Sequence, residues 1–305
     1  MKDSSRRTVR VALITGTAIG ALVLSACGSS SSTTESSTPA AGESSAAASS
    51  GPDVDTAKAA LIEPGALTMC TQLAYKPFEF TEGDEVVGLD VDLVDLAAAK
   101  LGVETKVIDT PFEGIQSGEV TATGKCDLSA AGMTINEARS KVILFSVPYF
   151  DATQAMVVLD ASTATTLADL RDKRVAGQTG TTGLAYLKEN QAANGYEIVE
   201  YADFPSESDS LLTGQVDAAV QDLPVWNQFV SDNAGAVKVA AQFDTGEQYG
   251  IGMKLGNTAL KTIVDDAITE AKADGTYNEL LTKWGFPVPE GTSTGSSSST
   301  APSSN

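Results

Sequence analysis

The chain alternates short runs of apolar and β-branched residues with longer segments whose apolar positions recur at helical spacing. The runs of the first series are residues 66–73, 88–102, 105–110, 125–134 and 136–145. Short apolar runs bounded by turn residues are typical of strands, and the longer periodic segments are typical of helices. The alternation predicts an α/β protein, in which strands and helices follow one another along the chain.

A second series begins after Tyr149. Its predicted strands are residues 154–160, 174–180, 196–201 and 216–222, with helical segments between them. Near the end, residues 246–254 predict one more strand, and residues 258–285 predict two helices separated at Gly275. We expect two lobes, one built from residues 57–153 plus 247–290 and the other from residues 154–246. The chain would cross between them twice.

The first residues of the chain have the pattern of an export signal. Several basic residues precede an uncharged run at residues 11–24, which is shorter than the roughly 20 apolar residues that span a bilayer. Residues 1–26 therefore predict a secretory signal peptide. The segment Leu24-Ser25-Ala26-Cys27 resembles the lipobox of bacterial lipoproteins and implies lipid attachment at Cys27, on the outer face of the cytoplasmic membrane. The alternative is a short N-terminal helix that happens to hold a cysteine.

Two segments have a composition typical of disordered chain. Residues 27–56 and 291–305 consist mainly of Ser, Thr, Ala, Gly, Pro and acidic residues, which bury too little apolar surface to offset the entropy lost on ordering. We expect a flexible tether and a flexible tail around a folded part at about residues 57–290.

The composition argues against several classes of function. The 305 residues contain 20 Lys and Arg against 40 Asp and Glu, a formal net charge of −20, and no histidine. The acidic balance argues against a nucleic-acid partner, and the missing histidine removes the commonest general base and metal ligand. We expect no metal and no cofactor.

Asp90, Asp92 and Asp95 suggest a calcium loop, but Asp95 stands where an EF-hand needs Gly and Leu101 where it needs Glu. We therefore predict that Asp90 caps a helix.

Polar side chains stand at two predicted strand ends. Gly180, Thr181 and Thr182 lie between a predicted strand and a predicted helix, where backbone N–H groups and hydroxyls can seat an anion. Thr as a simple helix cap is the alternative. Arg139 follows Thr134 by five residues and can grip a carboxylate with two parallel bonds, or else form a local surface ion pair.

Three further positions are candidates. Asp222 ends the predicted strand at residues 216–222, where its carboxylate can hold an ammonium group or cap the following helix. Tyr75 and Phe112 lie in loops after strands and would ordinarily be assigned to core packing.

Six segments together carry a family resemblance. They are AYKPFEFTEGDEVVGLDVDL, AAGMTINEAR, VAGQTGTT, VDAAVQDLPV, EQYGIGMKLGN and KADGTYNELLTKWG. In this order they resemble the polar amino-acid-binding proteins of ABC importers, the family 3 extracellular solute-binding proteins, over about residues 64–286. The resemblance implies a two-lobe periplasmic-binding-protein-like fold of type II, with two crossover strands and a ligand cleft between the lobes.

The resemblance also implies a role for each site residue. The ligand carboxylate would be held by Arg139, Thr134, Gly132, Thr181 and Thr182. The ammonium would be held by Asp222 and a backbone carbonyl at Ala131. The ligand side chain would meet Tyr75, Phe112, Gln72 and Glu79.

The expected function is binding, not catalysis. A monomer would capture a free amino acid and deliver it to the permease and ATPase subunits of an ABC transporter. The acidic protein and Gln72 beside the aromatic Tyr75 and Phe112 lead us to expect a polar uncharged or cationic ligand. Many relatives have Asp where this chain has Gln72, which argues against an assignment to basic amino acids alone. The alternatives are a lipoprotein that presents its ligand state to a receptor, and a dehydratase on the same scaffold with Glu79 as its acid.

Two cysteines remain once Cys27 is set aside. An exported protein favours pairing of an even set, and neighbouring parallel strands ending at Cys70 and beginning after Cys126 could bring the two together. We predict a Cys70–Cys126 disulfide, with two buried free thiols as the alternative.

Overall fold

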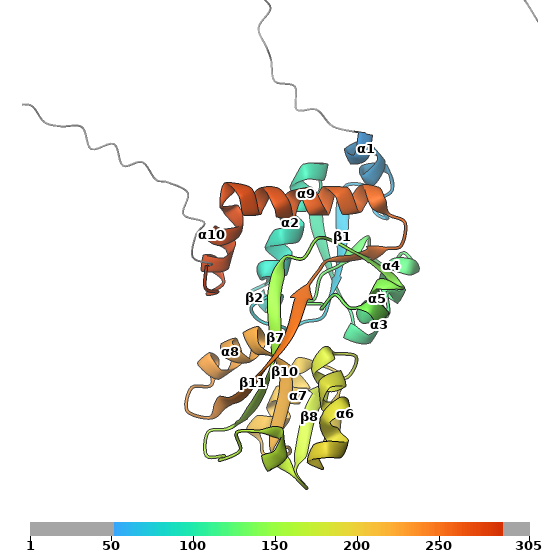
Figure 1. Ribbon diagram of the computed structural model, residues 1–305. Helices are drawn as coiled ribbons and strands as arrows, with labels where there is room; N and C mark the ends of the chain where they lie inside the picture. The colour runs from blue at the N-terminus through green and yellow to red at the C-terminus, as the bar shows by residue number, and fades with distance from the viewer. Residues whose placement is uncertain (1–51, 289–305) are drawn as a thin grey trace, which may run out of the picture. The chain divides into compact units, whose positions relative to one another are not determined.

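The computed structural model describes residues 52–288, which fall within one compact unit (Figure 1). The predictions for the signal peptide, Cys27, most of the tether and the tail lie outside these residues. Strands and helices alternate along the described chain, as the sequence predicts, and gather into two five-stranded sheets and one hairpin.

The first sheet has the strand order β4-β1-β5-β12-β6. Its strands are β1 (Ala66–Thr71), β4 (Glu104–Asp109), β5 (Leu128–Ser129), β6 (Ile143–Phe145) and β12 (Gly252–Lys254). Strands β4, β1 and β5 are parallel, whereas β12 runs antiparallel to both of its neighbours. The other four strands come from residues 66–145, whereas β12 comes from residues 252–254 and lies between β5 and β6.

The other elements of this lobe are helices and a hairpin. They are α1 (Pro52–Ala59), the hairpin β2 (Phe80–Glu82) and β3 (Glu85–Val87), α2 (Leu89–Leu101), α3 (Phe112–Gln116), α4 (Glu119–Ala122), α5 (Glu137–Ser140), α9 (Thr258–Asp274) and α10 (Thr276–Lys283). Gly275 separates α9 from α10 with a φ of 94°, which confirms the predicted break.

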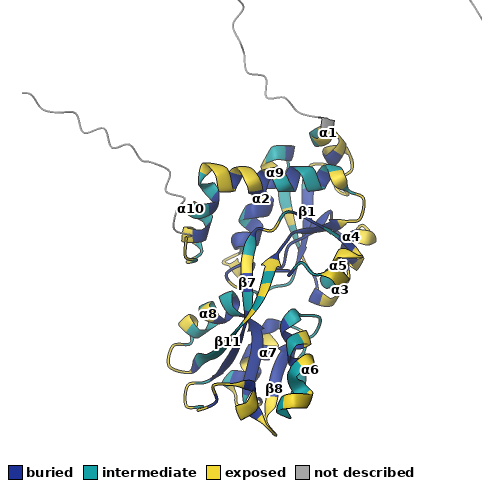
Figure 2. Ribbon diagram, in the orientation of Figure 1, coloured by how far each residue is buried: buried dark blue, intermediate teal, exposed yellow. Residues whose placement is uncertain are grey.

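The second sheet has the strand order β11-β7-β10-β8-β9. Its strands are β7 (Phe150–Leu159), β8 (Arg174–Gln178), β9 (Glu197–Tyr201), β10 (Ala218–Asp222) and β11 (Val237–Tyr249). Its helices are α6 (Thr182–Asn194), α7 (Phe204–Leu212), α8 (Leu223–Asp232) and the 3₁₀ turn Leu167–Leu170. The inner strands of both sheets are largely buried, whereas the edge strands β4, β9 and β11 are only partly buried and the helices expose their outer faces (Figure 2).

Two long antiparallel strands connect the lobes. Strand β7 enters the second sheet and β11 returns from it, paired from Leu159 opposite Val237 to Phe150 opposite Tyr249. The register shifts between Phe243 and Glu247. The two crossover strands of the expected fold are thereby confirmed (Figure 1). The lobe boundaries at residues 153 and 246 stay a prediction.

One local prediction was wrong. Gly88, not Asp90, stands at the N-cap of α2, with a φ of 141°. A Cβ at Gly88 would lie 2.0 Å from the carbonyl oxygen of Phe78, so the close approach of the hairpin requires glycine. Asp90 is fully buried and accepts hydrogen bonds from the Gly132 N–H at 2.9 Å and the Tyr149 hydroxyl at 2.5 Å. The carboxylate thus joins distant segments instead of capping its own helix.

The predicted disulfide is present. Cys70 and Cys126 are bonded, with their Cα atoms 5.7 Å apart. Strands β1 and β5 are parallel neighbours, with Cys70 opposite Ser129, which brings the two cysteines together as expected. Among residues 52–288, every helix is too short or too polar to cross a bilayer.

Candidate functional site

A narrow cleft lies where the parallel strands of both sheets end. Its lining residues are Gln72, Tyr75, Glu79, Phe112, Ala131, Gly132, Thr134, Arg139, Gln178, Thr181, Thr182, Gln221 and Asp222. All eleven residues expected to meet a ligand are among them. Gln178 and Gln221 were not expected. Ligand sites of α/β proteins commonly lie at the carboxyl ends of parallel strands, because the loops there converge from different segments.

Arg139 supplies a buried positive charge at one side of the cleft. Asn136 caps the short helix α5 by accepting from the Arg139 N–H. The guanidinium then donates to the carbonyl oxygens of Thr134 at 2.7 Å and Gly180 at 2.9 Å, and it lies over the Phe112 ring. Burial lowers the pKa of Arg139, an effect that Asp222 opposes most strongly. No carboxylate of the described residues lies within ion-pair distance of this cation, so the surface ion-pair alternative does not apply.

The turn between β8 and α6 lies opposite Arg139. Thr181 is the N-cap of α6: its hydroxyl accepts from the Leu184 N–H at 3.1 Å and donates to the Gln178 carbonyl at 2.7 Å. Its side chain therefore has the capping role that the sequence left open. The Thr182 hydroxyl lies 3.4 Å from that of Thr134, across the cleft. The positive end of a thirteen-residue helix thus adjoins the cleft beside Arg139.

Asp222 supplies a buried negative charge. It occupies the N-cap position of α8, but its side chain makes no capping bond, so the cap alternative was wrong for this carboxylate. The carboxylate accepts from the hydroxyls of Tyr75 (3.0 Å) and Tyr249 and from the amide of Gln154. Burial, reinforced by repulsion from Glu247, raises the pKa of Asp222 to about 6.

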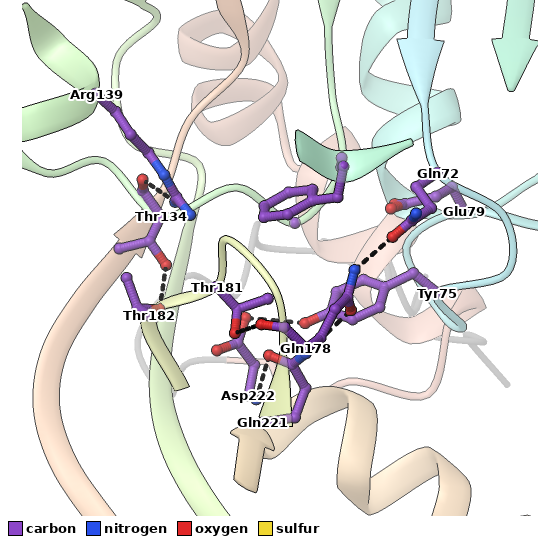
Figure 3. A pocket seen from close by; sticks show the side chains of 13 residues that line it. Gln72, Tyr75, Glu79, Thr134, Arg139, Gln178, Thr181, Thr182, Gln221 and Asp222 are labelled. Atoms are coloured by element: carbon purple, nitrogen blue, oxygen red, sulfur yellow. Dashed lines mark hydrogen bonds between the residues drawn. The ribbon is translucent and has the colours of Figure 1, made fainter. Parts of the chain in front are cut away.

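Three glutamine amides form a linked group at another side of the cleft (Figure 3). Gln178 donates to Gln72 at 2.5 Å, and Gln221 donates to Gln178 at 3.3 Å. Gln178 and Gln221 are almost fully buried. The sequence analysis missed these two because a glutamine at a strand end has no chemistry that distinguishes it from a packing residue. Gln178 lies within VAGQTGTT, one of the segments that carry the family resemblance, and this position was the available signal for it.

The labelled side chains are arranged around a common space in Figure 3. Arg139 and Thr134 lie on the left of the view, Gln72 and Glu79 on the right, and Asp222 below them. The bonds from Arg139 to Gly180, from Gln178 to Gln72 and from Tyr75 to Asp222 join one lobe to the other. The structure therefore has its lobes closed on the cleft.

Comparison with known proteins identifies the chain's relatives. Residues 67–287 match the model of the bacterial extracellular solute-binding proteins, family 3. The chain is 30% identical over 219 residues to ABC transporter arginine-binding protein 1 of Escherichia coli K12, covering 70% of this chain and 87% of that protein. It is 29% identical over 226 residues to the L-cystine-binding protein TcyJ of the same organism, covering 73% and 83%.

The chain is also similar to solved structures of amino-acid-binding proteins. An ancestral arginine-binding protein bound to arginine has a TM-score of 0.68 and 36% identity, covering 72% of this chain and 98% of its own. The structure of an ancestral arginine-binding protein bound to glutamine has the same TM-score and identity, covering 73% and 98%. These relatives have the two-lobe fold of type II periplasmic binding proteins, which confirms the fold expected from the sequence.

Proposed function

The chain belongs to the bacterial extracellular solute-binding proteins, family 3, and from that membership we propose that it captures a free amino acid in the cleft and delivers it to the permease and ATPase of an ABC importer. The family consists of solute-binding proteins. The proposed action is therefore binding and release, with no bond made or broken, and Glu79 does not serve as a catalytic acid.

One observation carries this proposal: the cleft contains a buried cation and a buried anion that are not paired with each other. Arg139 is bonded to backbone carbonyls and Asp222 to hydroxyls and an amide. Burying isolated charges is costly unless a partner of opposite sign completes the site. A zwitterionic amino acid brings a carboxylate for Arg139 and an ammonium for Asp222, so it complements both charges at once.

Each lining residue then has a proposed task. Arg139, Thr134 and the backbone at Gly132 hold the ligand carboxylate together with the α6 terminus at Thr181 and Thr182. Asp222 and the carbonyl of Ala131 hold the ammonium. Tyr75, Phe112, Gln72 and Glu79 meet the ligand side chain, and we add Gln178 and Gln221 to this group because they are bonded in series with Gln72.

We propose a polar uncharged or cationic amino acid as the ligand. The relatives support this class, since they are named for arginine and cystine, and solved relatives hold arginine or glutamine. The linked amides support it too, because glutamine both donates and accepts hydrogen bonds. Ligand binding to both lobes at once favours the closed state over an open one by its differential contacts. The permease would respond to that closure.

We also propose that the protein is a monomer exported on a lipid anchor at Cys27. The basic and apolar segments of residues 1–26 and the lipobox-like sequence before Cys27 support this. Membrane fractionation compared between the natural chain and Cys27→Ser tests it, and an unchanged membrane-bound fraction for the variant would contradict the anchor.

Isothermal titration calorimetry against the common L-amino acids tests the ligand proposal. We expect at least one polar uncharged or cationic amino acid to bind at about micromolar affinity. The proposal fails if the folded protein binds none of them, and the ligand class fails if glutamate or aspartate binds most tightly.

A further inference from the structure

Two buried carboxyl groups, Glu79 and Asp90, lie beside the cleft. Glu79 is 1% exposed and lines the cleft, and Asp90 is fully buried in the first turn of α2. The β2–β3 hairpin between them folds back so that the Asp90 N–H donates to the carbonyl of Phe78, the residue before Glu79. Two acids separated by a hairpin in sequence are thus neighbours in the interior.

Their hydrogen bonds differ. Asp90 accepts from the Gly132 N–H and from the Tyr149 hydroxyl, one bond to each carboxylate oxygen. Glu79 Oε2 is buried with no hydrogen-bond partner among the described residues. Donors stabilise the ionised form of a carboxylate, and two neighbouring buried acids do not both ionise readily. The negative charge therefore belongs on Asp90 and the proton on Glu79.

The other groups around Glu79 agree with this assignment. The titratable groups that interact electrostatically with Glu79 are Asp90 on α2, Tyr75 in the loop after β1 and Tyr149 before β7. None of these groups is a cation. Burial first, and Asp90 second, raise the pKa of Glu79 well above its ordinary value, against a smaller opposing effect of the Thr71 hydroxyl.

The position of Glu79 decides which ligands reach it. With the ligand carboxylate at Arg139 and the ammonium at Asp222, the side chain points toward the third side of the cleft, where Gln72 and Glu79 lie together in Figure 3. A guanidinium or ammonium group on a long side chain would meet the Glu79 carboxyl, which lines the cleft. An uncharged side chain would leave the Glu79 carboxyl group protonated.

We propose, on the basis of the function proposed above, that Glu79 is protonated in the ligand-free protein and that a cationic ligand side chain displaces its proton to bulk water, leaving a carboxylate–cation pair. Net charge is conserved, because one proton leaves the site as one positive charge enters it. Binding of a cationic amino acid then releases close to one proton, whereas binding of an uncharged amino acid of the same length does not.

This exchange makes affinity depend on pH. Below the ligand-free pKa of Glu79, each fall of one pH unit weakens binding of the cationic ligand by up to about tenfold, because the proton competes with the ligand. Above that pKa the affinity is constant. The α-ammonium and Asp222 add a pH dependence of their own, which an uncharged ligand shares.

L-Arginine and L-citrulline are matched probes, since citrulline replaces the guanidinium by an uncharged urea. Calorimetry of each in phosphate and in imidazole, between about pH 6 and 8, gives the number of protons exchanged with the buffer. We expect arginine to release at least about half a proton more than citrulline somewhere in this range, and a smaller difference throughout would overturn the proposal.

Variants locate the proton. Glu79→Gln should abolish the difference between arginine and citrulline, whereas Glu82→Gln, which changes an exposed carboxyl of the same hairpin, should leave it intact. Retention of the difference in folded Glu79→Gln would overturn the assignment. If Glu79→Gln does not fold, the comparison in the natural protein still decides. Failure of every amino acid to bind refutes the proposed function, whereas binding of citrulline or glutamine but not of arginine refutes only this inference.

Discussion

The guanidinium of Arg139 donates to the carbonyl oxygen of Gly180 across the cleft, at 2.9 Å. Arg139 follows β5 of the first sheet, and Gly180 lies in the turn after β8 of the second. The residue proposed to hold the ligand carboxylate therefore also contacts the opposite lobe. Ligand capture and lobe closure share one side chain.

Arg139→Ala should abolish useful affinity for the amino acid. A desolvated carboxylate without its charged partner typically loses about 2 to 5 kcal/mol of binding free energy, a weakening of roughly 30-fold to several thousand-fold in Kd. Calorimetry measures this change in Kd. Lys141→Ala is the matched control, since Lys141 is an exposed cation just after the same helix. Undiminished binding by folded Arg139→Ala would refute the placement of the site.

Asp222→Asn should weaken binding by a similar factor through the ammonium end. Asparagine keeps the shape but loses the negative charge, and its amide hydrogens oppose the donors of Tyr75, Tyr249 and Gln154. Asp217→Asn, in the loop before the same strand, is the control. An equal Kd for Asp222→Asn and the natural protein would show that Asp222 does not hold the ligand ammonium.

Gln72→Asp should favour cationic over uncharged ligands. It places a carboxylate at the side-chain end of the cleft, and we expect the ratio of arginine to citrulline affinity to rise by about tenfold, the effect of a partly solvated charge pair. Gln72→Asn controls for the shorter side chain. A ratio that is equal in the two variants would show that Gln72 does not face the ligand side chain.

The ligand-free protein should become more stable as the pH falls from about 7 to about 5. Burial raises the pKa values of Asp90 and Asp222 to about 6 from 3.8. A folded-state pKa above the unfolded value means that the folded protein binds the proton more tightly, so stability is greatest at low pH and is lost as the pH rises through about 6. We expect these two groups to add about 1 to 3 kcal/mol to the free energy of unfolding, and the raised pKa of Glu79 adds to this gain.

Urea denaturation across this pH range measures the gain. Saturating ligand should reduce it, because an ammonium paired with Asp222 keeps that carboxylate ionised. A protein that loses stability steadily from pH 7 to pH 5 would contradict the raised pKa values.

Removal of the disulfide should destabilise the fold. Replacing Cys70 and Cys126 by Ser opens a loop spanning a sequence separation of 56 residues, which costs about 4 kcal/mol in the chain-entropy model. Phe112 lies in this loop, so ligand affinity should fall as well. Denaturation and calorimetry of the double variant, compared with the oxidised natural protein, test both effects. A free energy of unfolding equal to that of the natural protein would show that the bond contributes nothing.

The residues that the sequence singles out converge on one cleft because they follow strand ends within ordered motifs. Arg139 and Asp222 carry charges and Thr134 a hydroxyl at predicted strand ends, whereas Tyr75 was given a ligand contact only by the family resemblance. Every one of them lines the cleft. Their tasks toward a ligand remain proposals.

The errors have physical causes. Asp90 was predicted to be a helix cap because local patterns cannot show that its partners, Gly132 and Tyr149, lie 42 and 59 residues away. Gln178 and Gln221 were missed because an amide reveals a role only through its neighbours. The hairpin of β2 and β3 was not predicted either, since two strands of three residues each give little periodicity.

The strand order of the first sheet determines when that lobe can be completed. Strand β12 separates β5 from β6, so the sheet stays unfinished until residues 252–254, more than a hundred positions after Phe145, are available. The second sheet needs only the continuous stretch from Phe150 to Tyr249. A chain emerging from its N-terminus can therefore assemble the second lobe first, while the half-built first lobe exposes apolar strand edges to chaperones and proteases until its last strand arrives.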